Sequence, residues 1–481
     1  MEMALDITDQ KRLSRPRQFF LQRGMLMACF IFGISTLLEI LFCRCLYADG
    51  SHEFIRVLEA QNFVSLMWSR HFAFYIYEFP LVLTIKSGVT NMGLLRLAFG
   101  LGCYLPWPAI LACCYWMSPK HFWLAVVGCA AGFLNAAFMA VGEHILAHAF
   151  FWSSLFAILF ARPLKPSAAV ILLISATGFL FSYESQLFLC LPLAALSLWR
   201  IAEERMVKPR ENKFFQWSIL LAAAGLFLAA SGIGLYAVLK PEIPVNFGGF
   251  RANAESLLWH KGWTLTWTII WACLMLGAWL SENFWKIITS RAAIIIQIIA
   301  LAIWGMWPLL RPDQLDTARE YDNRILDLLV PLLLLPVALI LRYRPAWIAS
   351  KEKYLAQMAA ILLAVQSLWQ ICASWQWHKD VGRLQTLLSA NAGPILLRST
   401  VLARSSMESW RADFDWSWPC LSIALNPSKN IKSLVCSEFY INPRYHFWQP
   451  FDPLDAKTLP ALQHYGIDFT EYKSAIISHE Q

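Results

Sequence analysis

The chain has 481 residues, of which 58% are hydrophobic and 15% charged, and its formal net charge is +8 at pH 7. A soluble domain carries more charge on its surface, so this composition excludes a soluble globular protein and predicts an all-α polytopic membrane protein. The 40 basic residues lie in short clusters between long apolar runs, a pattern that reflects membrane topology and excludes a nucleic-acid-binding protein.

The N-terminal part predicts one span followed by an outer loop. Residues 1–24 are polar and basic, and the positive-inside rule places them in the cytoplasm. The first span is expected over 25–46, because its apolar run is long enough to be an anchor instead of a cleavable signal peptide. A polar loop at 47–70 then lies outside. The second span is expected over 71–86.

Ten further apolar segments follow, two of them within one run, at 93–117, 121–161, 167–182, 185–199, 214–239, 263–281, 292–310, 325–341 and 354–375. The resulting total is even, which would return the C-terminus to the cytoplasm. Yet the basic linkers 200–213 and 342–353 are expected in the cytoplasm. The span at 354–375 then carries the chain across once more, which places the C-terminal tail outside the cytoplasm. We therefore expect about eleven full passes. One re-entrant or broken helix should lie between 93 and 166, either at the Pro-interrupted 93–117 or within 121–142.

The C-terminal tail, 376–481, is polar and mixed, and follows the transmembrane domain predicted over 25–375. Its short apolar stretches, 395–401 and 433–439, alternate with Asn, Pro and Asp turn signals. This pattern predicts a small extracytoplasmic α/β domain. Outside the cytoplasm, a disulfide between Cys420 and Cys436 is an open alternative to two free thiols.

The outer loop 47–70 begins with an acidic residue and a predicted helix. Asp49 stands just after the first span. Ser51 is a candidate N-cap for an amphipathic helix whose apolar residues recur at helical spacing, with Glu53 on its polar side. Such a helix is expected to lie in the plane of the membrane interface. Inside the first span, Glu39 is expected to make a polar contact within the bundle.

This layout resembles the C superfamily of membrane glycosyltransferases, which use polyprenyl-phosphate sugars as donors. Those enzymes place a catalytic Asp or Glu after the first span, followed by interfacial helices, and often end in an outer soluble domain. The resemblance covers the architecture of nearly the whole chain and is residue-specific only around Asp49. It implies that Asp49 is the general base for the acceptor hydroxyl, with Glu53 as a second acidic candidate. The alternatives are a polar residue ending a span for Asp49 and a solvated helix face for Glu53.

A transfer from a lipid phosphate releases a phosphate, so cationic side chains are expected to face it. Arg suits this role because its planar fork can bond two oxygens at once. The outer-side candidates are Arg70, at the start of the second span, and Arg319 and Arg324, before the span at 325–341. For each of them the alternative is snorkelling at the interface.

Polar residues in apolar surroundings are further donor-binding candidates, because they are costly to place there. They are Glu143, His144, Tyr183 and Glu184. Tyr183 and Glu184 occupy the tip of a hairpin, where they either bond sugar hydroxyls or cap the hairpin. His144 and His148 are four residues apart, a spacing that can hold a divalent metal, but two ligands are too few to predict a metal cofactor.

The sequence thus predicts a glycosyltransferase of a bacterial inner membrane, with a cytoplasmic N-terminus and a periplasmic C-terminus. It would move a sugar from a polyprenyl-phosphate carrier to a glycolipid, polysaccharide or protein acceptor of the cell envelope, surrounded by membrane lipids. One alternative is a transporter or lipid flippase, although the two halves of the chain do not match as they do in many transporters. The other is a polysaccharide polymerase or ligase, whose key residues would lie in the outer loop 240–262.

Overall fold

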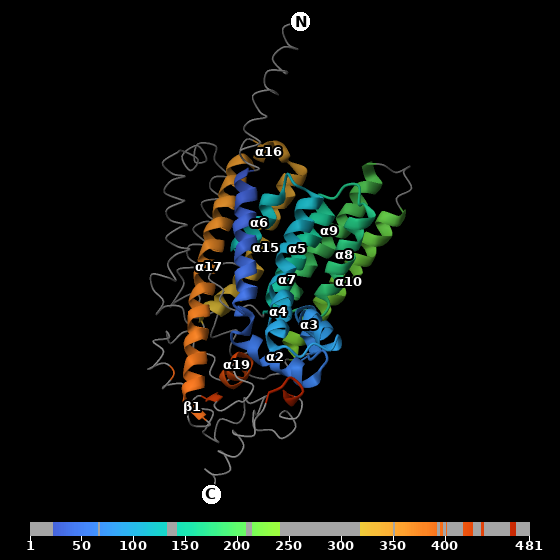
Figure 1. The fold of residues 1–481 in the computed structure, drawn as a ribbon. Helices are drawn as coiled ribbons and strands as arrows, with labels where there is room; N and C mark the ends of the chain where they lie inside the picture. Colours follow the sequence, from blue (N-terminus) through green and yellow to red (C-terminus); the bar gives the residue numbers. More distant parts are fainter. Residues whose placement is uncertain are drawn as a thin grey trace.

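The structure is a computed structural model of the chain, and it describes residues 23–65, 68–131, 142–207, 214–240, 318–349, 352–391, 395–397, 401, 417–426, 434–436 and 462–467. Within these residues the chain forms an elongated bundle of helices (Figure 1). One end of the bundle carries α16 and is called here the α16 end. The other end carries α2, α19 and β1 and is called the α2 end.

The helices of the N-terminal half follow a helix at Arg23–Leu41. They are the short 3-10 helices η1 (Arg44–Leu46) and η2 (Trp68–Arg70), and α2 (Asp49–Ala60), α3 (His71–Lys86), α4 (Met92–Tyr104), α5 (Pro106–Met117), α6 (Phe122–Ala131), α7 (Glu143–Leu159), α8 (Pro166–Phe179), α9 (Gln186–Val207) and α10 (Phe214–Leu239). The later elements are α15 (Ala318–Tyr343), α16 (Pro345–Ala349), α17 (Glu352–Ala390), β1 (Ile395–Leu397), α19 (Trp418–Leu425) and β2 (Leu434–Cys436).

Five helical segments of the described chain are long and apolar enough to cross a membrane: Arg23–Leu41, Met92–Met117, Gln186–Met206, Phe214–Leu239 and Glu352–Ala390. Three shorter apolar helices, α6, α7 and α8, lie among them. On α10, Leu221, Leu228 and Leu235 recur every seventh residue and are exposed. Rows of exposed apolar side chains are unusual on a water-soluble surface and fit one that faces lipid.

The opposite side of α10 is lined by small residues, which allow helices to approach closely. Ala223, Ala230 and Gly234 are among its buried positions. A Cβ atom on Gly234 would lie 3.0 Å from the backbone nitrogen of Leu187 on α9. The antiparallel pair α9–α10 is therefore held by close backbone packing.

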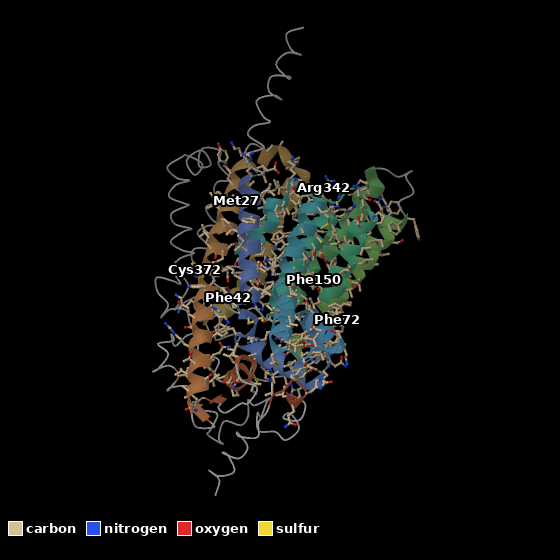
Figure 2. The ribbon with its side chains drawn as sticks, in the orientation of Figure 1. Met27, Phe42, Phe72, Phe150, Arg342 and Cys372 are labelled. Atoms are coloured by element: carbon tan, nitrogen blue, oxygen red, sulfur yellow. The ribbon has the colours of Figure 1, made fainter. Side chains whose placement is uncertain are left out.

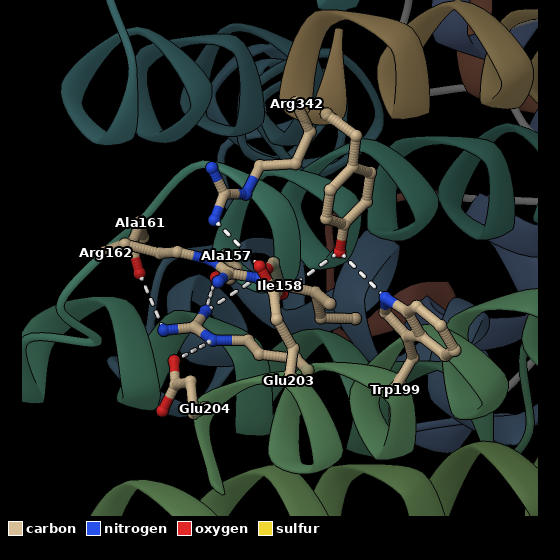
Figure 3. Close-up of polar contacts among 10 residues, drawn as sticks. Ala157, Ile158, Ala161, Arg162, Trp199, Glu203, Glu204 and Arg342 are labelled. Atoms are coloured by element: carbon tan, nitrogen blue, oxygen red, sulfur yellow. Dashed lines mark hydrogen bonds and ion pairs between the residues drawn. The ribbon is translucent and has the colours of Figure 1, made fainter. Parts of the chain in front are cut away.

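A buried ion-pair network joins three helices at the α16 end (Figure 3). Arg200 on α9 caps the C-terminus of α7, because its guanidinium donates to the carbonyl oxygens of Ala157, Ile158 and Ala161 at 2.8–3.1 Å. Its Nε donates to Glu204 at 3.0 Å. These bonds satisfy carbonyl groups that the end of α7 leaves without helical partners.

The neighbouring Glu203 accepts hydrogen bonds from three side chains, one in the segment after α7 and two at the end of α15. Arg162 donates to it at 2.7 Å, Arg342 of α15 at 3.3 Å and the Tyr343 hydroxyl at 3.1 Å (Figure 3). Figure 2 shows Met27 and Arg342 near this end, and Phe72 toward the α2 end. Three arginines and two glutamates thus pair with one another at the α16 end.

The segment predicted as the second span, 71–86, forms the helix α3. α3 has 16 residues, contains Pro80, and belongs to neither group of apolar helices. By contrast, Met92–Met117 is long and apolar enough to cross, and it is divided at Leu105 into α4 and α5, so the interruption predicted at Pro106 and Pro108 is present. These prolines fall in the first turn of α5, where a missing N–H costs little.

The C-terminal part continues directly from the bundle. α17 is one helix of 39 residues, so the predicted boundary at 376 falls inside it. β1 and β2 pair in parallel, with Leu396 opposite Val435, and each lies within an apolar stretch that predicted a strand. Between them in sequence comes α19, which packs against α2. In α19, Cys420 is a buried free thiol, and its burial raises the thiol pKa.

Candidate active site

Asp49 is the first residue of α2 and lies just past the end of the first helix. It is half-buried, whereas the four residues after it are buried. Ala48 occupies the N-cap position, with φ of 48°. The expected cap at Ser51 is therefore wrong: its hydroxyl donates to Ala48 O at 3.0 Å and to Ser417 O at 3.2 Å. The positive end of the helix dipole stabilises a negative charge on Asp49.

The remainder of α2 is buried instead of lying solvated at an interface. Phe54, Val57 and Leu58 are fully buried, and α19 covers the helix. Glu53 is only 1% exposed, which corrects its expected position on a solvated face. The cause is the C-terminal segment, whose helix returns over α2 and which the local helical pattern could not reveal.

Glu53 pairs with a second buried acid, Glu78 of α3, through a side-chain hydrogen bond. Glu78 also accepts the backbone N–H of Val64 at 2.8 Å. Two carboxyl groups in such contact away from water cannot both be ionised, so one holds a proton. Asp49, Glu53 and Glu78 are called here the carboxylate cluster, because Asp49 and Glu53 are one helical turn apart on α2.

His52 lies beside this cluster and is 2% exposed. Burial, together with the charge of Arg56, lowers its pKa to about 4. The imidazole is therefore neutral at pH 7. It can accept or donate a hydrogen bond without adding charge to the buried helix.

Arg70 and Glu184 form a two-pronged ion pair between η2 and the turn that joins α8 to α9. Arg70 Nε donates to Oε1 at 3.2 Å, and Nη2 donates to Oε1 and Oε2 at 3.0 and 3.1 Å. The Arg70 side chain is 9% exposed and that of Glu184 is 25% exposed. The ring of Tyr183 lies 4.7 Å from the guanidinium carbon. Three sequence-predicted residues thus meet in one site, called here the arginine pair with its tyrosine.

His144 extends this group into the bundle. Its ring centroid lies 5.6 Å from that of Tyr183, and its Nε2 lies 3.4 Å from Asp327 Oδ2. His148, one turn further along α7, places Nδ1 3.3 Å from Asp327 Oδ1. Asp327 is 2% exposed on α15. These three residues are called here the His–Asp cluster.

Asp327 is a buried residue that the sequence predictions omitted. It interrupts an apolar run, Ile325-Leu326-Asp327-Leu328-Leu329-Val330, and an acid in such a run is a functional candidate by default. The same rule had selected His144. The sequence could not predict the contact of Asp327 with His144 and His148, because α7 and α15 are separated by more than 150 residues.

Both ring nitrogens of His148 have protein neighbours in the His–Asp cluster. His148 Nδ1 lies 2.8 Å from the backbone oxygen of Asp327, and Trp152 Nε1 donates to His148 Nε2 at 3.0 Å. His148 Nε2 also lies 3.1 Å from the backbone oxygen of Gly128, so both ring nitrogens contact neighbouring protein groups. Across the described residues no group of three His, Cys, Asp or Glu side chains is placed to hold a metal ion.

α3 touches all three groups. It begins directly after Arg70, carries Glu78, and its Tyr77 hydroxyl donates to the carbonyl oxygen of Gly142 at 2.5 Å, immediately before α7. The helix therefore positions the carboxylate cluster, the arginine pair and the N-terminal end of the His–Asp cluster relative to one another.

A separate buried ion pair fixes the first helix to α17. Arg44 Nη1 donates to Glu39 at 3.4 Å and to Ser374 at 3.3 Å, and it also bonds Gln370. Glu39 accepts from Ser35 as well, at 3.4 Å. The predicted role of Glu39 as a polar contact inside the bundle is confirmed.

Several predicted site residues cannot be placed in the same detail. Glu143 opens α7, and Arg319 and Arg324 lie in the first turns of α15, but their side chains fall outside the described residues. The spans at 263–281 and 292–310 and the loop 240–262 also lie outside them.

The α2 end thus combines a half-exposed carboxylate, a paired arginine and a buried acid flanked by two histidines. Such an arrangement can accept a proton at Asp49 and hold an anion at Arg70. Comparison with known proteins adds nothing to this description, because no protein-family model, no curated protein and no solved structure matches the chain.

Proposed function

We propose that the protein is a membrane glycosyltransferase that moves a sugar from a polyprenyl-phosphate carrier to an acceptor of the cell envelope. The observation that carries the proposal is the position of Asp49. It is a half-buried acid at the start of α2, whose residues 50–55 are buried, and it follows the membrane-length helix Arg23–Leu41. The two short helices α2 and α3, between the first and second long helices, fit the interfacial helices that the family resemblance implies.

In the proposed reaction, the acceptor hydroxyl attacks the anomeric carbon of the donor sugar while its proton passes to Asp49. The bond from that carbon to the phosphate oxygen breaks, and its electron pair leaves with the polyprenyl phosphate. Arg70 stabilises the negative charge of the leaving phosphate. Tyr183 contacts Arg70, and His144 contacts Tyr183, so these two residues are the proposed sugar-binding side chains.

The proposed topology has eleven passes, with α3 at the outer interface instead of across the membrane. In this proposal, nine crossings within the described residues are assigned to the five long helices, the three shorter apolar helices and α15. The remaining two are those predicted at 263–281 and 292–310. This arrangement puts the basic α16 end in the cytoplasm, and the α2 end with a small C-terminal α/β domain in the periplasm of a bacterial inner membrane.

The deciding experiment substitutes Asp49 by Asn, which keeps size and removes the base. Cells that lack the protein should lose one envelope sugar and accumulate the matching lipid-linked sugar. Wild type should restore it, and Asp49→Asn should lower transfer about 10²- to 10⁴-fold at equal membrane level. Glu59→Gln is the matched control, because it makes the same acid-to-amide change at the other end of α2 and should restore the sugar fully. Full restoration by Asp49→Asn would refute the assignment.

The His–Asp cluster favours a second candidate, a transporter or lipid flippase. Ionisable residues buried among membrane helices often mark proton or ion pathways. In that case Asp327→Asn should abolish the phenotype while Asp49→Asn spares it. The glycosyltransferase proposal expects the opposite order of severity for the two substitutions. A polymerase or ligase depends on the loop 240–262, and the described residues add no support for it.

A further inference from the structure

The arginine pair has the geometry of an occupied anion site. Arg70 donates through Nε and Nη2 at 3.0–3.2 Å to the two oxygens of Glu184. This planar fork is the arrangement in which a guanidinium binds two oxygens of a phosphate. Glu184 therefore stands where an anionic ligand of Arg70 would bind.

Aromatic side chains lie on η2, which carries Arg70, on the turn that carries Glu184, and on the neighbouring helices α3 and α10. The ring of Trp68 lies 6.4 Å from that of Phe181 and 5.6 Å from that of Tyr236. Tyr75 is 38% exposed and Tyr236 is 51% exposed. Tyrosine and tryptophan side chains with one wet and one apolar side gather at the level of lipid headgroups.

From these contacts we infer that the arginine pair is a lipid-phosphate site in its closed state, in which Glu184 competes with the phosphate for the same N–H groups of Arg70. The identity of the lipid as a polyprenyl phosphate rests on the proposed function. The exchange requires rotation of the Glu184 side chain, which is partly exposed in the turn between α8 and α9. The ring of Tyr183 stays against the guanidinium and keeps Arg70 in position.

The direction of the effect follows from electrostatics. The Arg70 side chain is 9% exposed, and a guanidinium so poorly hydrated is unfavourable without a negative partner. Removal of the Glu184 charge takes away one negative partner of Arg70, and the incoming phosphate can occupy its place. The affinity for the phosphate therefore rises when the competing carboxylate is lost.

The test measures binding of undecaprenyl monophosphate to the full chain in lipid nanodiscs. Glu184→Gln should bind about tenfold more tightly than wild type, and Glu184→Asp, which keeps the charge on a shorter stem, should fall between them. The double variant Arg70→Gln with Glu184→Gln should lose the gain. Glu203→Gln is the matched control, since it removes the acid from a similar Arg–Glu pair at the α16 end and should leave binding unchanged.

Equal affinity of wild type, Glu184→Gln and Glu184→Asp would overturn the inference. Inorganic phosphate distinguishes a lipid headgroup from a free phosphate: weak competition by millimolar phosphate supports the lipid site, and full displacement overturns it. The binding assay needs no sugar transfer. If Asp49→Asn is fully active, the proposed function is wrong. The ratio of the affinities of wild type and Glu184→Gln for the lipid phosphate still tests the inference about the arginine pair.

Discussion

Asp49 differs from the neighbouring acids in its contact with solvent. Glu53 and Glu78 are almost completely buried and bonded to each other, so they hold α2 against α3. Asp49 is half-exposed at the tip of the same helix. A base must reach both a substrate hydroxyl and, after the reaction, a route for its proton. Among the three acids of the carboxylate cluster, Asp49 meets this requirement.

His52 makes the α2 end sensitive to acid. Its pKa in the folded protein is about 4, below the value of 6.5 for an unperturbed histidine, because burial disfavours the charged ring. Between these values the unfolded chain binds a proton that the folded chain does not. Stability is therefore fully present above pH 6.5 and is lost as the pH falls toward 4.

We expect this histidine to cost roughly 2 kcal/mol of stability at pH 5 relative to pH 7.5. Thermal unfolding of the purified protein at both pH values measures the loss. In His52→Gln the drop in unfolding temperature should be smaller, whereas His464→Gln, at an exposed position, should behave as wild type. An unchanged drop in His52→Gln would show that other groups cause the acid sensitivity.

At the residue scale, one chemical rule selected several residues that lie in contact in the structure. The cost of polar groups in apolar runs selected His144, Tyr183 and Glu184, and the structure brings them into one line of contacts with Arg70. The same rule applied to 325–330 would have found Asp327. The contact between Glu53 and Glu78 could not be predicted from the sequence, because it depends on how α3 packs against α2.

At the scale of elements, α3 is the helix whose predicted crossing stays a prediction. Its apolar run is long enough to suggest a short span, yet it has Pro80 and a buried acid within 16 residues. The long helices α9, α10 and α17 were predicted within a few residues at most ends, since hydropathy alone defines them. Placing α3 required knowledge of its neighbours, above all of α4.

Gly102 sets the distance between α3 and α4. A Cβ atom there would lie 1.8 Å from the carbonyl oxygen of Tyr77 and 2.8 Å from its carbonyl carbon. These are backbone atoms, which cannot move away by a change of rotamer as side-chain atoms can. Gly102→Ala should therefore push α3 away and destabilise the protein by about 1–3 kcal/mol.

Thermal unfolding in detergent measures this cost, and the transfer assay should show reduced activity because α3 positions the site. Gly225→Ala on α10 is the control, since nothing lies within 4 Å of its added Cβ. That change should be neutral or slightly stabilising, because alanine favours a helix more than glycine does. Equal stability of the two variants would mean that α3 and α4 do not cross as closely as described.

At the scale of the whole molecule, the C-terminal segment closes over the N-terminal one. α17 lies beside the first helix through Arg44 and Ser374, and α19 covers α2, where Ser51 bonds Ser417. Gln385 of α17 also donates to Leu425 O of α19 at 2.8 Å. The candidate site is thus enclosed by residues from both ends of the chain. Such long-range closure is invisible to local sequence patterns.

The membrane topology is also a property of the whole molecule, and it depends on whether α3 crosses the membrane. If α3 stays at the interface, the loop at Gly88 lies on the same side as the end of α17, and the loop at Lys120 lies on the opposite side. A short epitope inserted after Gly88, after Lys120 or after Asn391 reports its side by accessibility in sealed cells. Gly88 and Lys120 are exposed, so the insertions should be tolerated.

We expect the epitopes at Gly88 and Asn391 to be reached from outside, and the one at Lys120 only after permeabilisation. The reason is that α4 and α5 then form the second crossing, which makes the count of passes odd and leaves the C-terminus outside. An epitope at Gly88 that is reached only after permeabilisation would show that α3 crosses. Arg70 and Glu78 would then lie on a crossing helix, and Asp49 would lose the interfacial neighbours on which its proposed role depends.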